Sequence, residues 1–334
     1  MRSLVTVQKI KDITAIPESD FLELAHVMGW QCVVKKGEFK IGDLGVYFEV
    51  DSFLPVEDRY EFLRASSYWE NVYNGLGFRI RTAKMRGQLS QGLLLPLEKF
   101  PEIDTFNEGE NLTERLGVKK WYIPETSNYS GTIIGNRPYG IPASDEIRLQ
   151  SAPEFLEELN GKPYYITTKM DGTSGIVYYI DGKIGCCSRN KELKDDGASL
   201  YWMPVYKYGL KEKLLKYGKN IVITGEICGP AIQRNKLRLK DIQWYVFDVK
   251  DWDAGSYFSY DEAVKICGEF GLQTVPLEER GESFSYTLEA LLEKAKGEYP
   301  SGLDKEGIVV RDLIRPKAIS FKVLNNDALL KEKD

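Results

Sequence analysis

Residues 165–179 read YITTKMDGTSGIVYY, and the interpretation of the second half of the chain depends on this stretch. Apolar and β-branched residues on both sides of Asp171-Gly172 predict two strands joined by a tight hairpin turn, because Asp-Gly favours such turns. Lys169 then lies at the end of the first strand. The pattern fits a surface lysine beside a turn, and it equally fits a nucleophile held rigidly at the mouth of a pocket.

The rest of this half predicts more strands with helices between them. Strands are expected over 163–170, 174–180, 183–189, 220–229, 242–251, 307–312 and 318–325, and helices over 151–161, 210–218, 259–271 and 287–297. This mixture predicts an α+β fold of antiparallel sheets with flanking helices, rather than a doubly wound parallel sheet.

The first 118 residues predict a different domain. Short apolar or alternating runs such as LVTVQKI and LGVYFEV recur there, separated by glycine and proline. Strands at this spacing predict a small antiparallel β-barrel. Residues 119–147 contain Pro, Gly, Ser and Asn without a clear period, so we expect a linker that leads to a second domain over 148–334.

One basic run stands out in the N-terminal domain: FRIRTAKMRGQ, residues 78–88. A single strand here would place Arg79 and Arg81 on one face, and Lys84 and Arg86 extend the positive charge. The run is either a solvated sheet face or a track for the phosphates of a nucleic acid.

The composition excludes several classes of protein and of site. The net charge is −5 over 334 residues, so there is no overall basic excess, although a local patch is enough to bind nucleic acid. No apolar run suits a membrane span or a signal peptide, so we expect a cytoplasmic protein without a membrane partner. Five cysteines without CxxC spacing and a single histidine indicate neither a zinc site nor a histidine-based catalytic set. Lysine, carboxylates, arginine and a metal ion remain for catalysis.

Four further strand positions carry residues that suit a site. They are Glu226 in TGEICGP, Phe247 in YVFDV, Glu306 in KEGIVVR and Lys322 in AISFKVLN. Each has an ordinary structural explanation when taken alone: a ring such as Phe247 packs in cores, and a lysine such as Lys322 suits an edge strand.

Together, and in this order after Lys169, these residues resemble the motifs of the covalent nucleotidyltransferases, which are DNA ligases, RNA ligases and mRNA capping enzymes. The resemblance covers 148–325 and includes Arg189 in CSRN. About a dozen residues follow Lys322, so we expect no C-terminal barrel of the kind that DNA ligases and capping enzymes carry. A strand-rich domain comes first instead, as in a branch of ATP-dependent RNA ligases with an N-terminal OB-fold. Arg148, the basic run and the terminal SFKVLNN extend this resemblance to the whole chain.

The resemblance implies an OB-like barrel followed by an ATP-grasp-like nucleotidyltransferase domain. It implies a catalytic Lys169 that attacks the α-phosphate of ATP and carries AMP, with a nucleotide site made of Arg148, Lys169, Met170, Asp171, Gly172, Arg189, Glu226, Phe247, Glu306 and Lys322. Asp171, Glu226 and Glu306 are expected to hold Mg²⁺ or Mn²⁺, because these ions prefer oxygen ligands. Arg79, Arg81, Lys84 and Arg86 are expected to contact the nucleic acid.

The implied substrate is RNA, or an RNA-containing duplex, with a nick between a 3′-OH and a 5′-phosphate, sealed by a monomeric enzyme. A DNA ligase, a capping guanylyltransferase and a non-catalytic nucleic-acid-binding protein with a degenerate transferase fold remain as alternatives. The family's last motif usually contains a Lys-x-Lys pair, whereas this chain has Ser320-Phe321-Lys322. Lys317 is near in sequence, but strand alternation would put it on the face opposite Ser320.

Overall fold

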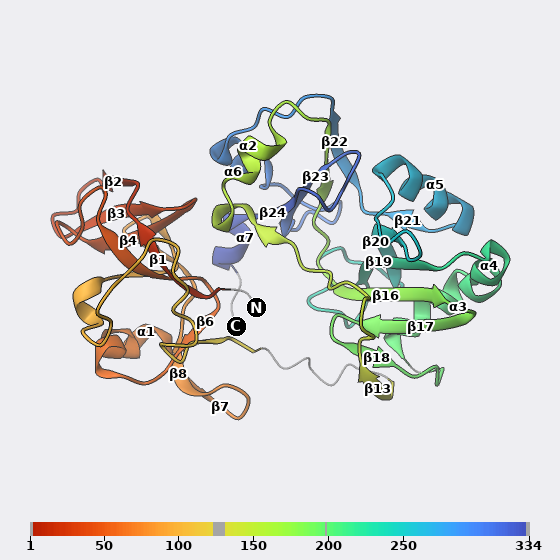
Figure 1. The fold of residues 1–334 in the computed structure, drawn as a ribbon, viewed down its shortest axis with the longest axis horizontal. Coiled ribbons are helices and arrows are strands. Elements are labelled where there is room, and N and C mark those ends of the chain that lie inside the picture. The colour runs from red at the N-terminus through yellow and green to blue at the C-terminus, as the bar shows by residue number, and fades with distance from the viewer. Residues whose placement is uncertain (1–2, 123–130, 198, 332–334) are drawn as a thin grey trace. The chain divides into compact units, whose positions relative to one another are not determined.

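The computed structural model describes residues 3–122, 131–197 and 199–331 and divides them into two compact units. The N-terminal unit contains the described residues 3–122 and 150–152, coloured red to orange in Figure 1 apart from its last few residues. The C-terminal unit contains 131–149, 153–197 and 199–331. No helix among these residues has the length and apolar character needed to cross a membrane.

The N-terminal unit consists of short antiparallel strands. They form sheets of order β1-β5-β11, β2-β3-β4, β12-β6-β8-β7 and β10-β9. The strands are β1 (Val5–Lys9), β2 (Asp12–Ala15), β3 (Leu22–Val27), β4 (Trp30–Lys35), β5 (Leu44–Phe48), β6 (Ser52–Leu54), β7 (Tyr68–Asn71), β8 (Gly75–Arg79), β9 (Thr82–Met85), β10 (Gln88–Gln91), β11 (Leu93–Pro96) and β12 (Lys119–Lys120), and the one α-helix described here is α1 (Arg64–Ser67). Alternation along β1 and β5 buries Val5, Val7, Val46 and Phe48 in one apolar cluster.

The prediction of one continuous strand over the basic run is wrong. The structure ends β8 at Arg79 and begins β9 at Thr82, so Arg79 and Arg81 do not share a strand face. β9 pairs with β10 through a two-residue turn at Arg86-Gly87, and both turn residues have positive φ, at 49° and 79°. Two positive φ values in succession are typical of a type I′ hairpin.

The C-terminal unit contains two sheets with helices packed on them (Figure 1). A seven-stranded sheet has the order β13-β18-β17-β16-β19-β20-β21, and a five-stranded sheet has the order β14-β24-β23-β15-β22. Their strands are β13 (Ile133–Asn136), β14 (Ile147–Arg148), β15 (Tyr164–Thr168), β16 (Thr173–Ile180), β17 (Lys183–Ser188), β18 (Lys191–Leu193), β19 (Ile221–Cys228), β20 (Gln243–Asp251), β21 (Gln273–Thr274), β22 (Leu277–Gly281), β23 (Gly307–Asp312) and β24 (Ser320–Leu324). The helices are α2 (Phe155–Leu159), α3 (Met203–Lys207), α4 (Leu210–Tyr217), α5 (Tyr260–Phe270), α6 (Leu288–Lys294) and α7 (Asn326–Lys331).

The predicted hairpin around Asp171-Gly172 is also wrong. β15 pairs with β22 and β23 in the five-stranded sheet, whereas β16 pairs with β17 and β19 in the seven-stranded sheet. Residues 169–172 therefore cross from one sheet to the other. Lys169 lies on this crossing, where side chains from both sheets can surround it.

The expected linker over 119–147 takes part in both units. β12 pairs with β6 in the N-terminal unit, and β13 pairs with β18 at the edge of the seven-stranded sheet. Ile141 is buried against Ile176 and Tyr178. Residues 123–130 of the predicted linker lie outside the described residues.

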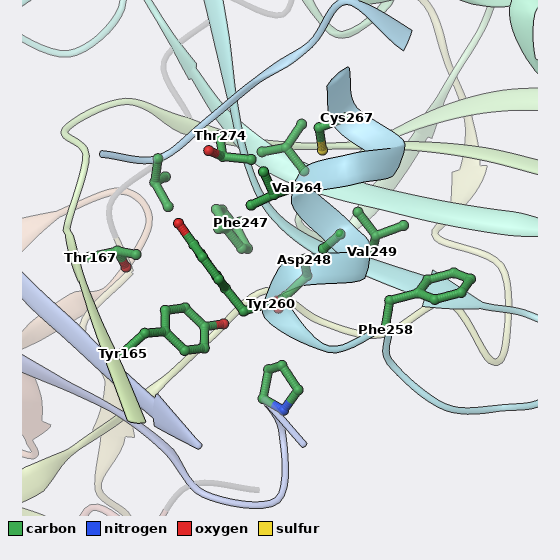
Figure 2. A pocket seen from close by; sticks show the side chains of 14 residues that line it. Tyr165, Thr167, Phe247, Asp248, Val249, Phe258, Tyr260, Val264, Cys267 and Thr274 are labelled. Atoms are coloured by element: carbon green, nitrogen blue, oxygen red, sulfur yellow. The ribbon is translucent and has the colours of Figure 1, made fainter. Parts of the chain in front are cut away.

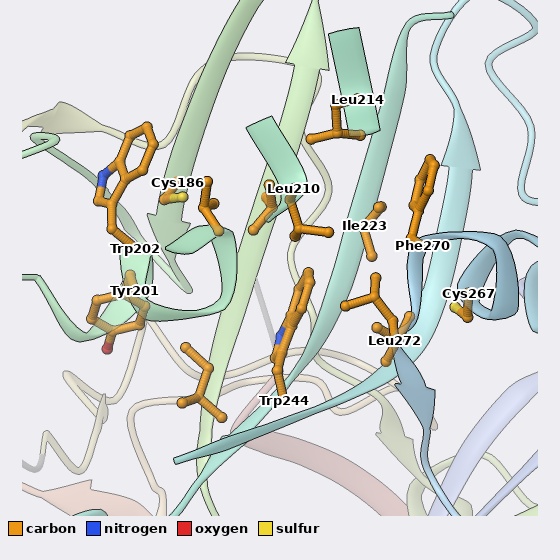
Figure 3. Packing of buried hydrophobic residues seen from close by; sticks show 14 of the residues in the cluster. Cys186, Tyr201, Trp202, Leu210, Leu214, Ile223, Trp244, Cys267, Phe270 and Leu272 are labelled. Carbon is orange, nitrogen blue, oxygen red and sulfur yellow. The ribbon is translucent and has the colours of Figure 1, made fainter. Parts of the chain in front are cut away.

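The largest apolar cluster of this unit lies between the seven-stranded sheet and helices α3, α4 and α5 (Figure 3). Trp244 and Val246 of β20 point into it, and so does Val249, although 249 breaks the alternation. The register of β20 against β19 skips Phe247, which makes Phe247 the extra residue of a β-bulge. The bulge directs Asp248 away from the apolar cluster. A carboxylate without a partner inside that cluster would cost folding free energy.

Candidate active site

A pocket of about 390 Å³ opens between residues of the two sheets in the C-terminal unit. Its size suits a nucleotide, because ligand pockets usually measure about 300–1,000 Å³. Of the predicted nucleotide-site residues, the pocket wall contains Lys169, Met170, Gly172, Arg189, Glu226, Phe247, Glu306 and Lys322. The structure thus brings together residues that are up to 153 positions apart, from Lys169 to Lys322.

The backbone of Lys169 is fixed on both sides. Its N–H donates to the carbonyl of Gly307 at 2.9 Å, and its own carbonyl accepts from the Tyr299 hydroxyl at 2.7 Å. The same hydroxyl accepts from the backbone N–H of Glu306 at 3.1 Å. Tyr299 therefore joins the backbone of Lys169 to that of Glu306, and the side chains of these two residues meet with Nζ 2.7 Å from Oε1.

Burial and the neighbouring carboxylates have opposite effects on the pKa of Lys169. Burial lowers the pKa of Lys169, but the carboxylates of Glu306, Glu226 and Asp171 together outweigh burial, so the net pKa is raised. Burial raises the pKa of Glu226 to about 8, and the Lys169 charge only partly offsets this. Burial, together with the charges of Lys169 and Arg148, lowers the pKa of Lys322 to about 8. Strongly shifted carboxyl and ammonium groups in one pocket are typical of active sites.

Gly172 is required by a close approach of two backbones. A Cβ at this position would lie 2.4 Å from the carbonyl oxygen of Ile227 in β19. The glycine of the Asp-Gly pair therefore lets the crossing segment lie against β19, and it does not form the tight hairpin turn that the sequence predicted.

Phe247 stands between two cavities of very different size. The smaller one measures about 20 Å³, and Figure 2 shows Phe247 there with Tyr165, Thr167 and Tyr260. That space holds roughly one water molecule, so only the larger pocket can take an adenine ring. The bulge at Phe247 is the feature that turns its ring toward these cavities and away from the apolar cluster.

Arg189 belongs to the pocket wall, whereas Arg148 and Asp171 lie outside it. Arg189 follows β17, and its guanidinium pairs with the Asp145 carboxylate at the pocket wall. Arg148 is paired in register with Lys322, and its charge reaches that lysine without contributing to the wall. Asp171 likewise lies outside the wall, although its charge acts on Lys169 and Glu226.

A buried ionic network, which we call the Arg311 network, reaches the pocket wall through Glu146 and Arg311. It consists of Arg311, Glu146, Asp248, Lys317 and Ser320. Arg311 donates through Nη2 to Glu146 at 2.7 Å, through Nη1 to the carbonyl of Phe247 at 2.6 Å, and through Nε to Ser320 at 3.1 Å. Its Nη1 also lies 3.2 Å from an oxygen of Asp248. The side chain of Arg311 is only 2% exposed, so the network fixes the strand that carries Phe247.

The prediction that Lys317 lies on the face opposite Ser320 is wrong. β24 begins at Ser320, so Lys317 precedes the strand and does not follow its alternation. Lys317 pairs with Glu146, and its Nζ lies 2.9 Å from Asp248. Ser320 donates to the other oxygen of Glu146 at 2.6 Å. The Lys317 ammonium and the Ser320 hydroxyl thus share the Glu146 carboxylate, so a lysine charge lies near Ser320 although residue 320 is not itself a lysine.

The three carboxylates predicted to share a metal ion do not form a ready-made site. Within the described ranges, no group of three or more His, Cys, Asp or Glu side chains is arranged to hold a metal. Asp171, Glu226 and Glu306 are nevertheless close enough for the charges of Asp171 and Glu306 to raise the pKa of Glu226. Their oxygens suit Mg²⁺ or Mn²⁺, which commonly bind one or two carboxylates together with water and phosphate oxygens.

The basic run of the N-terminal unit is only partly available to a ligand. The Arg79 side chain is 12% exposed, lies 4.9 Å from the ring of Trp121 and approaches Asp51 at 3.6 Å. Arg81, Lys84 and Arg86 are exposed. Arg79 therefore packs within its own unit, and the other three remain on the surface.

Sequence reasoning missed three groups of this site: Tyr299, the Arg311 network and the segment that contains Gln233, which also lines the pocket. An arginine inside the apolar strand GIVVRD was a usable signal, because such a charge needs buried partners. Tyr299 gave no signal, since its role depends on a contact with a residue 130 positions away.

Comparison with known proteins places the chain among RNA ligases over its whole length. An OB-fold domain family matches residues 4–97, and the RNA ligase family matches residues 162–324. A structure of Naegleria gruberi RNA ligase with PPi is 38% identical, covers 98% of both chains and has a TM-score of 0.92. No curated protein matches the chain.

Two mutant forms of the same ligase match over 100% of both chains. The one solved with AMP and Mn is 38% identical with a TM-score of 0.93, and one solved with ATP and Mn is 37% identical with a TM-score of 0.94. The matches confirm the predicted α+β architecture, with an OB-fold domain followed by a ligase domain.

Proposed function

The chain belongs to the RNA ligase family, and we propose that it is an ATP-dependent enzyme that seals nicks in RNA-containing duplexes through an AMP adduct on Lys169. One observation carries this proposal: the Lys169 ammonium lies 2.7 Å from Glu306 in a nucleotide-sized pocket that Phe247 and Lys322 also line.

In the first step, Nζ of Lys169 attacks the α-phosphorus of ATP. A nitrogen–phosphorus bond forms, the bond to the β-phosphate oxygen breaks, and pyrophosphate leaves. The raised pKa keeps Lys169 protonated before the nucleotide arrives, so its proton must be removed first. Glu306 is the base in direct contact with Nζ, and Lys322 supplies positive charge for the phosphoryl oxygens in the transition state.

A divalent cation fits this step. Bound among the carboxylate oxygens and the phosphates, it would offset the negative charge that keeps the pKa of Lys169 high and would orient the leaving pyrophosphate. The Naegleria gruberi ligase has been solved with ATP and Mn, which supports assigning the same two cofactors to this chain.

In the second and third steps, AMP passes from Lys169 to the 5′-phosphate at the break, and the 3′-OH then attacks that phosphate and releases AMP. We assign the exposed cations Arg81, Lys84 and Arg86 of the N-terminal unit to the duplex backbone. Arg79 is assigned to holding Trp121 instead. One polypeptide contains the complete pocket, so we propose that the enzyme acts as a monomer.

The test is a sealing assay on a nicked RNA duplex with a labelled 5′-phosphate. We expect ligated product with ATP and Mg²⁺ or Mn²⁺, and none when Lys169 is changed to Ala. Replacing ATP with GTP should abolish sealing, and a protein adduct formed from GTP but not from ATP would instead indicate a capping enzyme. Activity on an all-DNA nick that equals or exceeds activity on RNA would identify a DNA ligase and reject the proposal.

A further inference from the structure

The segment between β19 and β20 is a basic loop at the edge of the nucleotide pocket. Residues 229–240 read GPAIQRNKLRLK and carry four cations and no carboxylate. The cations are Arg234, Lys236, Arg238 and Lys240. We call this segment the basic loop; the assigned steps of the reaction make no use of its cations.

Both ends of the basic loop are fixed by strands of the active site. β19 carries Glu226 shortly before the loop, and β20 carries Phe247 shortly after it. Gln233, in the middle of the loop, lines the nucleotide pocket. The loop therefore forms part of the wall of the pocket that contains Lys169.

The basic loop has a defined and strained conformation. Four of its non-glycine residues have positive φ: Ala231 at 63°, Gln233 at 46°, Asn235 at 45° and Arg238 at 52°. Backbone in this region costs roughly 1–3 kcal/mol per residue and persists only where the surroundings hold it. Such strain is typical of segments shaped for a ligand.

Side chains supply that support. The side-chain Nδ2 of Asn235 donates to the carbonyl of Leu239 at 3.0 Å, and its Oδ1 accepts from the backbone N–H of Leu239 at 3.0 Å. Ser301 donates to the carbonyl of Lys236 at 2.5 Å. Leu237 and Leu239 pack against a buried cluster that includes Met170, the neighbour of Lys169. The backbone of the loop is thus held against the segment 169–172 that contains Lys169.

The charges of the loop face solvent. Arg234, Arg238 and Lys240 are exposed, and Lys236 is half-buried. In the described part of the chain, Arg238 and Lys240 form no ion pair. The nearest carboxylate in sequence, Asp241, lies 3.8 Å from another cation, Lys207. Arg238 and Lys240 therefore present positive charge to solvent.

We propose that the basic loop binds the RNA backbone next to the break, with Arg238 and Lys240 each contacting a phosphate. This inference rests on the proposed function and adds a second nucleic-acid contact, within the catalytic unit itself. Outward-facing cations on a held backbone suit backbone phosphates, and such contacts fix the position of a nucleic acid without reading its sequence. The loop would hold the RNA end over the pocket while AMP is transferred.

The test compares the double variant Arg238→Gln/Lys240→Gln with the wild type. Glutamine keeps the length of the side chains and removes only the charge, and both positions are exposed. The matched control is Lys211→Gln/Lys216→Gln, which removes two exposed charges from helix α4. The probe is a nicked RNA duplex with a 5′-phosphate, and its Kd is measured from about 50 to 200 mM salt.

Loss of two phosphate contacts should weaken binding about 10- to 30-fold near 150 mM salt and reduce the slope of log K against log salt by about 1.8. Sealing should slow in parallel, while formation of AMP adduct from ATP alone stays within about twofold. The control should match the wild type in all three assays.

Unchanged binding and an unchanged salt slope in the loop variant would overturn the proposal. A drop in adduct formation without RNA present would also overturn it, because the loop would then serve ATP rather than RNA. The two proposals fail separately: absence of any adduct in the wild type rejects the adenylylation chemistry, whereas the binding assay still reports on the loop.

Discussion

Removal of the charge of Arg311 should strongly destabilise the C-terminal unit. Arg311 is 2% exposed and contacts Glu146, Asp248, Ser320 and the carbonyl of Phe247. In Arg311→Met, Lys317 remains as the one cation of the network beside two buried carboxylates. Breaking a buried pair by removing one partner costs about 3–5 kcal/mol. At about 2–4 °C per kcal/mol for a unit of this size, Tm should fall by about 6–20 °C.

The assay is thermal unfolding at neutral pH, with two further variants. Arg311→Lys keeps the charge but loses the planar fork that reaches several partners at once, so it should give a smaller fall in Tm. Arg280→Gln is the matched control, because Arg280 pairs with Asp261 at 2.6 Å on the surface. Exposed pairs contribute little, so this control should melt as the wild type does.

The network also predicts a dependence of stability on pH. Burial alone would raise the pKa of Glu146, but the charges of Arg311 and Lys317 lower it from 4.5 to about 2. A folded-state pKa below the unfolded value adds stability above about pH 4.5, and this stability is lost as the pH falls toward 2. Arg311→Met should reduce this acid-labile part. If Arg311→Met melts within about 2 °C of the wild type, the network does not stabilise the unit and the reasoning is refuted.

Two further predictions concern the pocket itself. Phe247→Ala should weaken ATP binding about 5- to 150-fold, since stacking on an aromatic ring contributes about 1–3 kcal/mol per base. Phe247→Tyr keeps an aromatic ring and should bind ATP as the wild type does. If the alanine variant and the wild type bind ATP with equal affinity, Phe247 does not stack on the adenine. Tyr299→Phe removes the hydroxyl that joins Lys169 to Glu306, so single-turnover adduct formation should slow about 10-fold (about 1.4 kcal/mol) with little change in the affinity for ATP. An unchanged rate would show that Tyr299 does not position the nucleophile.

The sequence predicted the individual strands and the residues that share one pocket better than the pairing between strands. Lys169, Glu226, Phe247, Glu306 and Lys322 line one pocket as expected. Their strands were recognisable because alternation and β-branching are local properties. Pairing is a tertiary property, and a turn-forming Asp-Gly pair could not reveal that the strands on its two sides belong to different sheets.

The remaining errors have similar physical causes. The bulge at Phe247 breaks the period of two, so alternation alone would have pointed Asp248 into the apolar cluster. The start of β24 at Ser320 freed Lys317 from the alternation assumed for it. Glu146 was missed because the segment around it has no period, and only the fold reveals its partner Arg311.

The intact mass of the protein after incubation with ATP and Mg²⁺ tests the role of Lys169 most directly. We expect a gain of one AMP that maps to the peptide containing Lys169, is reversed by added pyrophosphate and is absent in Lys169→Ala. An AMP gain that persists in Lys169→Ala, or no gain with any nucleotide, would contradict the assignment of Lys169 as the nucleophile of this RNA ligase.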